Sequence, residues 1–176
     1  MKIIIVTGMP GAGKEEFLMV AGSMGIFSAR MGDAVREFYS ASSDRERGCS
    51  VGEFANAERE RFGKNIWAKR TVEKMSGNVF LIDGCRSMDE VRSFRELSND
   101  VRIIGIHSPP DQRYERLVNR GREDAPKDQD EFNKRDSREI SWGLAEVIAL
   151  ADIMIINASG LDEFRSAAEN VLRGLI

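Results

Sequence analysis

Gly8-Met9-Pro10-Gly11-Ala12-Gly13-Lys14, which directly follows the apolar run Ile3-Ile4-Ile5-Val6, contains most of the P-loop pattern G-x-x-x-x-G-K-[ST]. The glycines allow a tight turn in which several backbone N–H groups point at one anion. The positive end of the following helix strengthens that field. Lys14 can then reach the β- and γ-phosphates of a nucleotide. We therefore expect a buried strand, a phosphate-binding loop and a helix, with Gly8, Met9, Pro10, Gly11, Ala12, Gly13 and Lys14 in contact with phosphate.

Position 15 departs from this pattern, because Glu15 stands where the motif has Ser or Thr, and Glu16 follows it. The hydroxyl of that Ser or Thr normally ligates magnesium. Two carboxylates suit the N-terminus of a helix, yet they would repel a bound triphosphate. Two interpretations of Glu15 stay open: a magnesium ligand, directly or through water, or an acid that faces solvent at the start of the helix. We group Glu16 with the nucleotide-binding positions.

The composition is that of an ordinary soluble globular domain. The 176 residues carry a formal net charge of -3 and are 41% hydrophobic and 31% charged. This charge argues against a general nucleic-acid binder, and no apolar stretch is long enough to span a membrane. Cys49 and Cys85 stand in no metal-binding or redox spacing, which favours free thiols in a reducing cytosol. We expect one cytoplasmic domain; its oligomeric state stays open.

Short apolar runs alternate with helical patterns, which is typical of a parallel sheet flanked by helices. We predict strands at Lys2–Thr7, near Ile26–Ala29, and at Val79–Asp83, Val101–His107 and Asp152–Asn157. We predict helices at about Lys14–Met24, Asp33–Tyr39, Val51–Arg61, Asn65–Met75, Met88–Leu97, Asp111–Arg120, Asp130–Leu150 and Leu161–Leu172. The charged stretch Gly121–Gln129 is predicted to be a mobile loop. The elements together predict a three-layer α/β/α P-loop fold with a five-stranded parallel sheet, whose ligands bind at the carboxyl ends of the strands.

Arginines gather where a phosphoryl-transfer site would need them. They follow the second and third predicted strands, lie on or just past one later helix, and recur on the helix after the predicted mobile loop: Arg36, Arg86, Arg113, Arg116, Arg120, Arg122, Arg135 and Arg138. Arg113, Arg116 and Arg120 are three and four residues apart, so they share a helix face. Guanidinium groups suit phosphate oxygens and the charge that spreads over a transferring phosphoryl group. A solvated, salt-bridged surface is the alternative for any single arginine. For the whole set, beside a P-loop, we favour the functional interpretation.

These residues resemble the adenylate kinase-related P-loop kinases, a superfamily of nucleoside monophosphate kinases and dephospho-coenzyme A kinases, over nearly the whole chain. The nearest resemblance is to a largely archaeal family described as adenylate kinase-related. Gly32-Asp33-x-x-Arg36 is similar to the segment that binds the acceptor monophosphate. Asp83-Gly84-Cys85-Arg86 is similar to the D-G-F-P-R segment, one residue shorter and without the proline. Glu115-Arg116-Leu117-Val118-Asn119-Arg120-Gly121-Arg122 is similar to the entry into the lid, and Arg135 and Arg138 match arginines that leave it.

The resemblance implies ATP and Mg²⁺ as cofactors and a small nucleotide as substrate. It implies catalytic roles for Lys14, Arg36, Arg86, Arg120 and Arg135. It implies acceptor binding by Gly32, Asp33, Arg36, Asp83, Gly84, Arg86 and Arg138, and magnesium binding near Asp83, with Glu15 as the second candidate ligand. Arg116, Arg120, Asn157 and Gly160 are expected at the nucleotide, the last two because residues 151–157 and Gly160 are similar to the last strand and adenine loop of dephospho-coenzyme A kinases. We divide the domain into a core (1–31, 78–112 and 146–176), acceptor-binding helices (32–77) and a lid (113–145).

Three functions stay open. The first is an ATP-dependent nucleoside monophosphate kinase, for example with AMP as acceptor. The second is a dephospho-coenzyme A-type or other small-molecule kinase, in which Asp33 would be a general base rather than the N-cap of its helix. The third is a nucleotide-binding regulatory protein with little catalysis, because Glu15 replaces the magnesium-binding hydroxyl.

Overall fold

The computed structural model describes residues 1–42, 48–73, 75, 78–122 and 125–176. Within these residues, five strands form one parallel sheet in the order β2-β3-β1-β4-β5. They are β1 (Lys2–Thr7), β2 (Phe27–Arg30), β3 (Val79–Asp83), β4 (Asp100–His107) and β5 (Ile153–Ile156). The predicted fold class is confirmed, and the predicted strand ends differ from these by a single residue at most.

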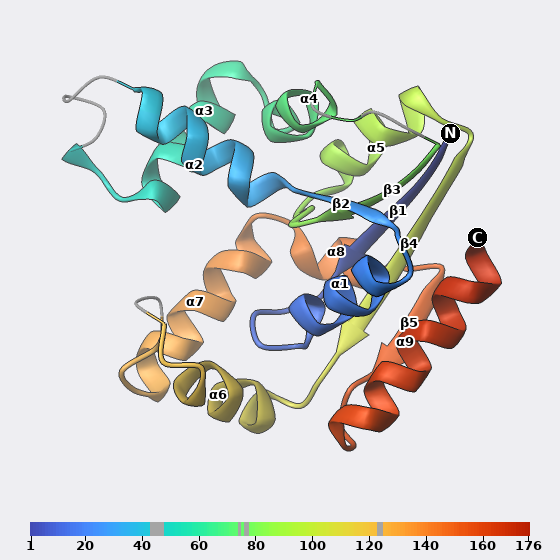
Figure 1. Ribbon diagram of the computed structural model, residues 1–176. Coiled ribbons are helices and arrows are strands. Elements are labelled where there is room, and N and C mark those ends of the chain that lie inside the picture. The colour runs from blue at the N-terminus through green and yellow to red at the C-terminus, as the bar shows by residue number, and fades with distance from the viewer. Residues whose placement is uncertain (43–47, 74, 76–77, 123–124) are drawn as a thin grey trace.

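Helices cover both faces of the sheet and give the three predicted layers (Figure 1). The described helices are α1 (Lys14–Ser23), α2 (Met31–Ala41), α3 (Val51–Phe62), α4 (Ile66–Val72), α5 (Met88–Leu97), α6 (Pro110–Asn119), α7 (Gln129–Ser141), α8 (Leu144–Ala149) and α9 (Leu161–Leu175). α1 and α9 pack on one face, and α2 to α5 and α8 pack on the other. α6 and α7 lie beyond the carboxyl ends of the strands (Figure 1).

The central strand β1 fixes the position of the loop that follows it. Its side chains alternate between the two cores: Ile3 and Ile5 pack under α2, α4, α5 and α8, and Ile4 and Val6 pack under α1 and α9. All four are fully buried. Burial of each such side chain stabilises the fold by about 1.5–3 kcal/mol. The first residue of the P-loop is therefore anchored at the middle of the sheet.

The predicted helix over residues 130–150 is wrong, because the structure has two helices there, α7 and α8. Gly143 separates them with a φ of 103°, a left-handed conformation that glycine adopts at little cost. The break lies against the loop after β3, since a Cβ on Gly143 would lie 3.3 Å from the carbonyl oxygen of Arg86. Side-chain periodicity continues across such a break, so the hydrophobic pattern alone predicted one helix.

Two local predictions also change. Asp33 is not a helix N-cap: β2 runs directly into α2, Arg30 occupies the cap position, and Asp33 lies in the first turn. In the predicted loop 121–129, Glu123 and Asp124 lie outside the described residues, and α7 already begins at Gln129. In the part of the chain that the structure describes, no helix has both the length and the apolar character needed to cross a bilayer.

Candidate active site at the P-loop

The P-loop between β1 and α1 has a backbone that requires glycine at three positions. Gly8, Gly11 and Gly13 have φ angles of 154°, 81° and 109°. A Cβ on Gly8 would lie 2.4 Å from a β4 carbonyl oxygen, and one on Gly11 would lie 2.7 Å from the carbonyl oxygen of Arg113. One on Gly13 would lie 2.3 Å from Nδ2 of Asn157. The glycines thus serve both the turn and the close approach of neighbouring segments.

Lys14 lies folded over the loop that it follows. Its ammonium group donates hydrogen bonds to the carbonyl oxygens of Gly8, at 2.6 Å, and Met9, at 3.3 Å. Burial lowers the pKa of Lys14 below its ordinary value, although the carboxylates of Asp83 and Glu139 act in the opposite direction. The positive charge is therefore already held at the loop, where a phosphate would receive it.

Two buried side chains brace the P-loop from outside. Arg113 of α6 donates to the carbonyl oxygen of Pro10 at 3.1 Å and forms two bonds to Asp136 of α7, at 3.0 and 2.6 Å. Asn157, just after β5, donates to the carbonyl oxygen of Ala12 at 2.8 Å. Its backbone and side-chain oxygens accept from Arg116, at 3.2 and 3.4 Å. Asn157 and Arg116 were expected to contact nucleotide; in the structure they hold the loop and also line the cleft beside it.

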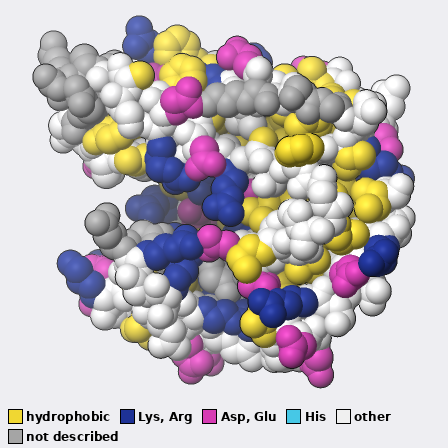
Figure 2. All heavy atoms as spheres, viewed as in Figure 1, with side chains coloured by type: hydrophobic (Ala, Val, Ile, Leu, Met, Phe, Trp, Pro, Cys, Tyr) yellow, Lys and Arg dark blue, Asp and Glu magenta, His cyan; other side chains and the backbone are white. Residues whose placement is uncertain are grey.

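A cleft of about 910 Å³ opens above the P-loop, between α2 on one side and α6 and α7 on the other. Figure 2 shows a deep hollow on this side of the molecule, with Lys and Arg side chains along its walls. The sequence-predicted residues that line the cleft are Gly8, Pro10, Gly11, Gly13, Lys14, Glu15, Glu16, Gly32, Arg36, Asp83, Gly84, Arg86, Arg116, Arg120, Arg135 and Asn157. Met9, Ala12, Asp33, Arg138 and Gly160 are not among its lining residues.

Arg86 is the best-fixed arginine on the wall opposite α1. Its Nε donates to Glu139 of α7 at 2.7 Å, and its guanidinium lies 5.4 Å from the ring centre of Trp142. Burial acts to lower the pKa of Arg86, but the carboxylates of Glu139 and Glu90 outweigh it and raise that pKa. Arg36, by contrast, is exposed and pairs with Asp33 on its own helix. This wall therefore combines a partly buried guanidinium group that Glu139 holds with an exposed guanidinium group on α2.

Glu15 and Glu16 are both engaged by arginines. Nη2 of Arg122 donates to both carboxylate oxygens of Glu15 at 2.7 Å, and Arg30 and Arg120 each lie 3.9 Å from that carboxylate. The hydrogen bond from Arg122 lowers the pKa of Glu15. Glu16 accepts from Arg165 of α9 at 2.6 Å. A direct magnesium-ligand role for Glu15 stays a prediction.

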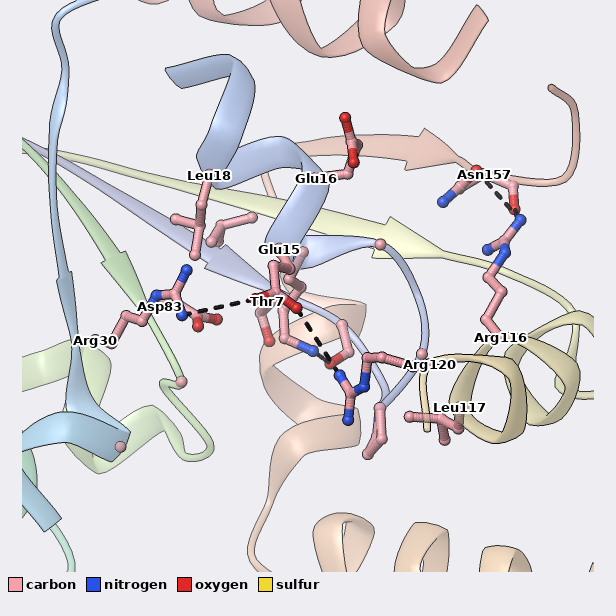
Figure 3. Close-up of a pocket in the computed structure, with 18 of the residues that line it drawn as sticks. Thr7, Glu15, Glu16, Leu18, Arg30, Asp83, Arg116, Leu117, Arg120 and Asn157 are labelled. Carbon is pink, nitrogen blue, oxygen red and sulfur yellow. Dashed lines mark hydrogen bonds and ion pairs between the residues drawn. The ribbon is translucent and has the colours of Figure 1, made fainter. Parts of the chain in front are cut away.

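The carboxyl ends of β1 and β3, beside the loop, offer oxygen atoms that suit a divalent cation. The hydroxyl of Thr7 and the Oδ1 atom of Asp83 are buried without a hydrogen-bond partner among the described residues, and both residues line the cleft (Figure 3). Magnesium prefers oxygen ligands and keeps several waters, so it needs few protein atoms. The described residues contain no cluster of three or more His, Cys, Asp or Glu side chains that could hold a metal alone. Asp83 would hold magnesium together with nucleotide phosphates and water.

Sequence reasoning did not select three of the polar residues in the cleft: Thr7, Arg30 and Glu139. Thr7 and Arg30 end β1 and β2, and the rule that ligands bind beyond the carboxyl ends of strands could have found them. Glu139 lies four residues after Arg135, so it shares the helix face of that arginine. Arg122, which the sequence placed in the arginine set and in the lid-like stretch, also lines the cleft.

A family model described as an AAA domain matches residues 4–140, from β1 into α7. The UPF0200 protein TV0279 of Thermoplasma volcanium is 42% identical over 171 residues, which cover 97% of this chain and 96% of that protein. A UPF0200 protein of Sulfurisphaera tokodaii is 40% identical over 178 residues, which cover 100% of this chain and 98% of that protein. The chain belongs to the UPF0200 family, with an AAA domain.

Solved structures share the fold of this UPF0200 protein. TT1252 of Thermus thermophilus has a TM-score of 0.68 at 15% identity and covers 99% of this chain. Shikimate kinase of Bacteroides thetaiotaomicron has a TM-score of 0.65 at 15% identity and covers 98% of both chains. At such identities the likeness shows the fold alone, which is that of P-loop kinases. The P-loop domain indicates nucleotide binding in general.

Proposed function

We propose that this UPF0200 protein transfers a phosphoryl group from ATP to a small nucleotide, with a nucleoside monophosphate such as AMP as the acceptor. The observation that carries the proposal is the cleft itself, in which the P-loop and Lys14 face Arg36, Arg86 and Arg135. A nucleotide kinase needs cations on both sides of the transferred group, because its two substrates are anions. The adenylate kinase-related resemblance of the sequence supports the same acceptor.

In the proposed reaction, an acceptor phosphate oxygen attacks the γ-phosphorus of ATP; a new P–O bond forms, the bond to the β,γ-bridging oxygen breaks, and ADP leaves. An ionised phosphate is already a nucleophile, so no general base is needed. Lys14, Arg120 and Arg135 neutralise the donor and the transferring group, and Arg36 and Arg86 hold the acceptor. Asp83 would help to hold magnesium, which would supply positive charge to the phosphates of the nucleotide.

A second candidate is a nucleotide-binding regulator with little turnover. The observation that favours it is the pairing of Glu15 with arginines, which neutralises charge that catalysis would use. The dephospho-coenzyme A alternative has less support, because its proposed base, Asp33, is exposed and pairs with Arg36.

Phosphoryl transfer from ATP should be measured with Mg²⁺ or Mn²⁺ against AMP, CMP, UMP, GMP, dephospho-coenzyme A and no acceptor. Transfer to one monophosphate that Lys14→Ala abolishes is the expected result. Nucleotide binding without transfer to any acceptor would favour the regulator. Transfer to dephospho-coenzyme A alone would assign the hydroxyl-acceptor alternative.

Arg36→Ala tests the acceptor site directly. We expect it to raise the KM for the acceptor about tenfold or more, since it removes a charge-assisted bond to the phosphate. Arg92→Ala is the matched control, because Arg92 also pairs with an aspartate three residues earlier, on an exposed face of α5. If the KM for the acceptor is the same in Arg36→Ala as in Arg92→Ala, the assignment of Arg36 to the acceptor site is wrong.

A further inference from the structure

Arginines that are far apart in the sequence lie around the carboxylate of Glu15. Arg30 ends β2, and Arg120 and Arg122 lie at and beyond the end of α6. All three guanidinium groups lie within 4 Å of the Glu15 carboxylate, and Arg122 bonds to both of its oxygens. Figure 3 shows Arg30 and Arg120 approaching Glu15 from opposite sides of the first turn of α1.

The neighbouring carboxylate shows that this arrangement is particular to position 15. Glu16 belongs to the same helical turn, yet its partner is Arg165 of α9, which also lies 3.8 Å from Asp162. Glu15 instead faces three guanidinium groups, next to Lys14. Like charges repel, and the Glu15 carboxylate at their centre offsets the repulsion among these cations.

The place that Glu15 occupies is one that a bound nucleotide would also need. In a P-loop, the side chain after the lysine lies beside the β- and γ-phosphates. Carboxylate and phosphate bind guanidinium groups through the same paired oxygen geometry. A terminal phosphate at this loop and the Glu15 carboxylate would therefore compete for the same donors and repel each other.

We propose that Glu15 is a specificity-determining residue whose carboxylate takes the place of the terminal phosphate of a triphosphate on Arg30, Arg120 and Arg122. A triphosphate displaces the carboxylate from these arginines when it binds, whereas a diphosphate leaves the Glu15–Arg122 pair intact. Glu15 thus lowers the affinity for triphosphates and leaves the affinity for diphosphates nearly unchanged. The inference rests on the proposed nucleotide site but not on phosphoryl transfer.

The experiment is calorimetric titration of the full chain with ATP, ADP and inorganic tripolyphosphate in EDTA, so that no metal contributes. Glu15→Gln is expected to tighten ATP and tripolyphosphate about tenfold, and ADP less than about twofold. A tenfold change corresponds to about 1.4 kcal/mol. In an Arg122→Gln background, the gain for ATP from Glu15→Gln should fall below about threefold, because the principal shared donor is absent.

Two variants separate competition from a general charge effect. Glu16→Gln removes the same charge from the same turn without touching the arginines around Glu15, so it should change the affinities for ATP and ADP by the same factor. Glu169→Gln, which removes the partner of Arg173 on the exposed side of α9, should leave all three affinities unchanged. Thermal unfolding verifies that each variant is folded.

The outcomes divide cleanly. Equal tightening of ATP and ADP by Glu15→Gln, or no tightening of ATP, overturns the inference. If the chain binds neither nucleotide but binds tripolyphosphate, and Glu15→Gln tightens that binding, the inference is supported and the proposed function is overturned. A chain that binds none of the three ligands overturns both.

Discussion

At the scale of single residues, Asn157 is a buried polar side chain that braces the P-loop through hydrogen bonds. It is 6% exposed, its amide nitrogen donates to the P-loop, and its oxygens accept from Arg116. Only the absence of a Cβ on Gly13 lets it approach so closely. The resemblance to dephospho-coenzyme A kinases placed Asn157 at the nucleotide; the bonds to the loop could not be predicted, because they join residues 145 positions apart.

Asn157→Ala is expected to destabilise the fold by about 1–3 kcal/mol, because it leaves the carbonyl oxygen of Ala12 without its donor. It should also weaken nucleotide binding, since the loop loses its brace. Urea unfolding and calorimetry measure the two effects. Asn133→Ala, an exposed change on α7, should alter stability by no more than about 0.5 kcal/mol. Equal stability of the two variants would contradict the bracing role.

Glu15 also predicts a pH dependence. The hydrogen bond from Arg122 holds the folded-state pKa of Glu15 below its ordinary value of 4.5. As pH falls, the unfolded chain therefore takes up this proton first, and the stabilisation present above pH 4.5 is lost as pH falls through the folded pKa. The stability difference between the natural chain and Glu15→Gln should be constant near neutral pH and shrink below pH 4.5. A difference that grows on acidification would have the wrong sign.

At the scale of elements, Gly143 ends α7 and turns the chain into α8. Its left-handed φ and the nearby Arg86 carbonyl leave little room for a side chain. Trp142, directly before it, lies under the guanidinium groups of Arg59, Arg86 and Arg138. The break thus joins α7 to the loop after β3, and the same loop supplies Arg86 to the cleft.

Gly143→Ala is expected to cost about 1–3 kcal/mol, because alanine at this φ is strained and its Cβ meets backbone. Gly174→Ala is the matched control: Gly174 lies within α9 with open space around it, so alanine there should stabilise by about 0.4–1 kcal/mol. Denaturant unfolding of both variants gives the comparison. If both changes had the same sign, the account of the α7–α8 break would be wrong.

At the scale of the whole molecule, the positions of the strands and the parallel sheet were predictable because buried parallel strands are apolar on both faces, as in Val79–Asp83. The P-loop was predictable because its spacing is set by phosphate geometry. The α7–α8 break and the early start of α2 were not, since each depends on a backbone dihedral angle or a tertiary contact. The surroundings of Glu15 were predictable only in part. The sequence shows that Glu15 departs from the P-loop pattern, whereas only the fold shows that three arginines surround it.

The reactivity of the two cysteine thiols can show whether the whole domain unfolds as one cooperative unit. Cys85 is 1% exposed, and burial raises the pKa of its thiol well above the ordinary value; Cys49 is half-buried. An aromatic disulfide reagent should therefore label Cys49 first and Cys85 only through unfolding. In the Cys49→Ser variant, we expect Cys85 to be labelled at the same rate as the whole domain unfolds. Rapid labelling of both thiols would indicate that the core near the cleft opens independently.

The direction of the strands has a practical consequence for experiments on this protein. β1 starts, and α9 returns, at the side of the sheet away from the P-loop, so both chain ends lie far from the cleft (Figure 1). A tether, fluorophore or fusion partner attached at either end should leave the cleft unobstructed. The protein can therefore be immobilised on a sensor surface through Ile176 with its binding face toward the flowing ligand.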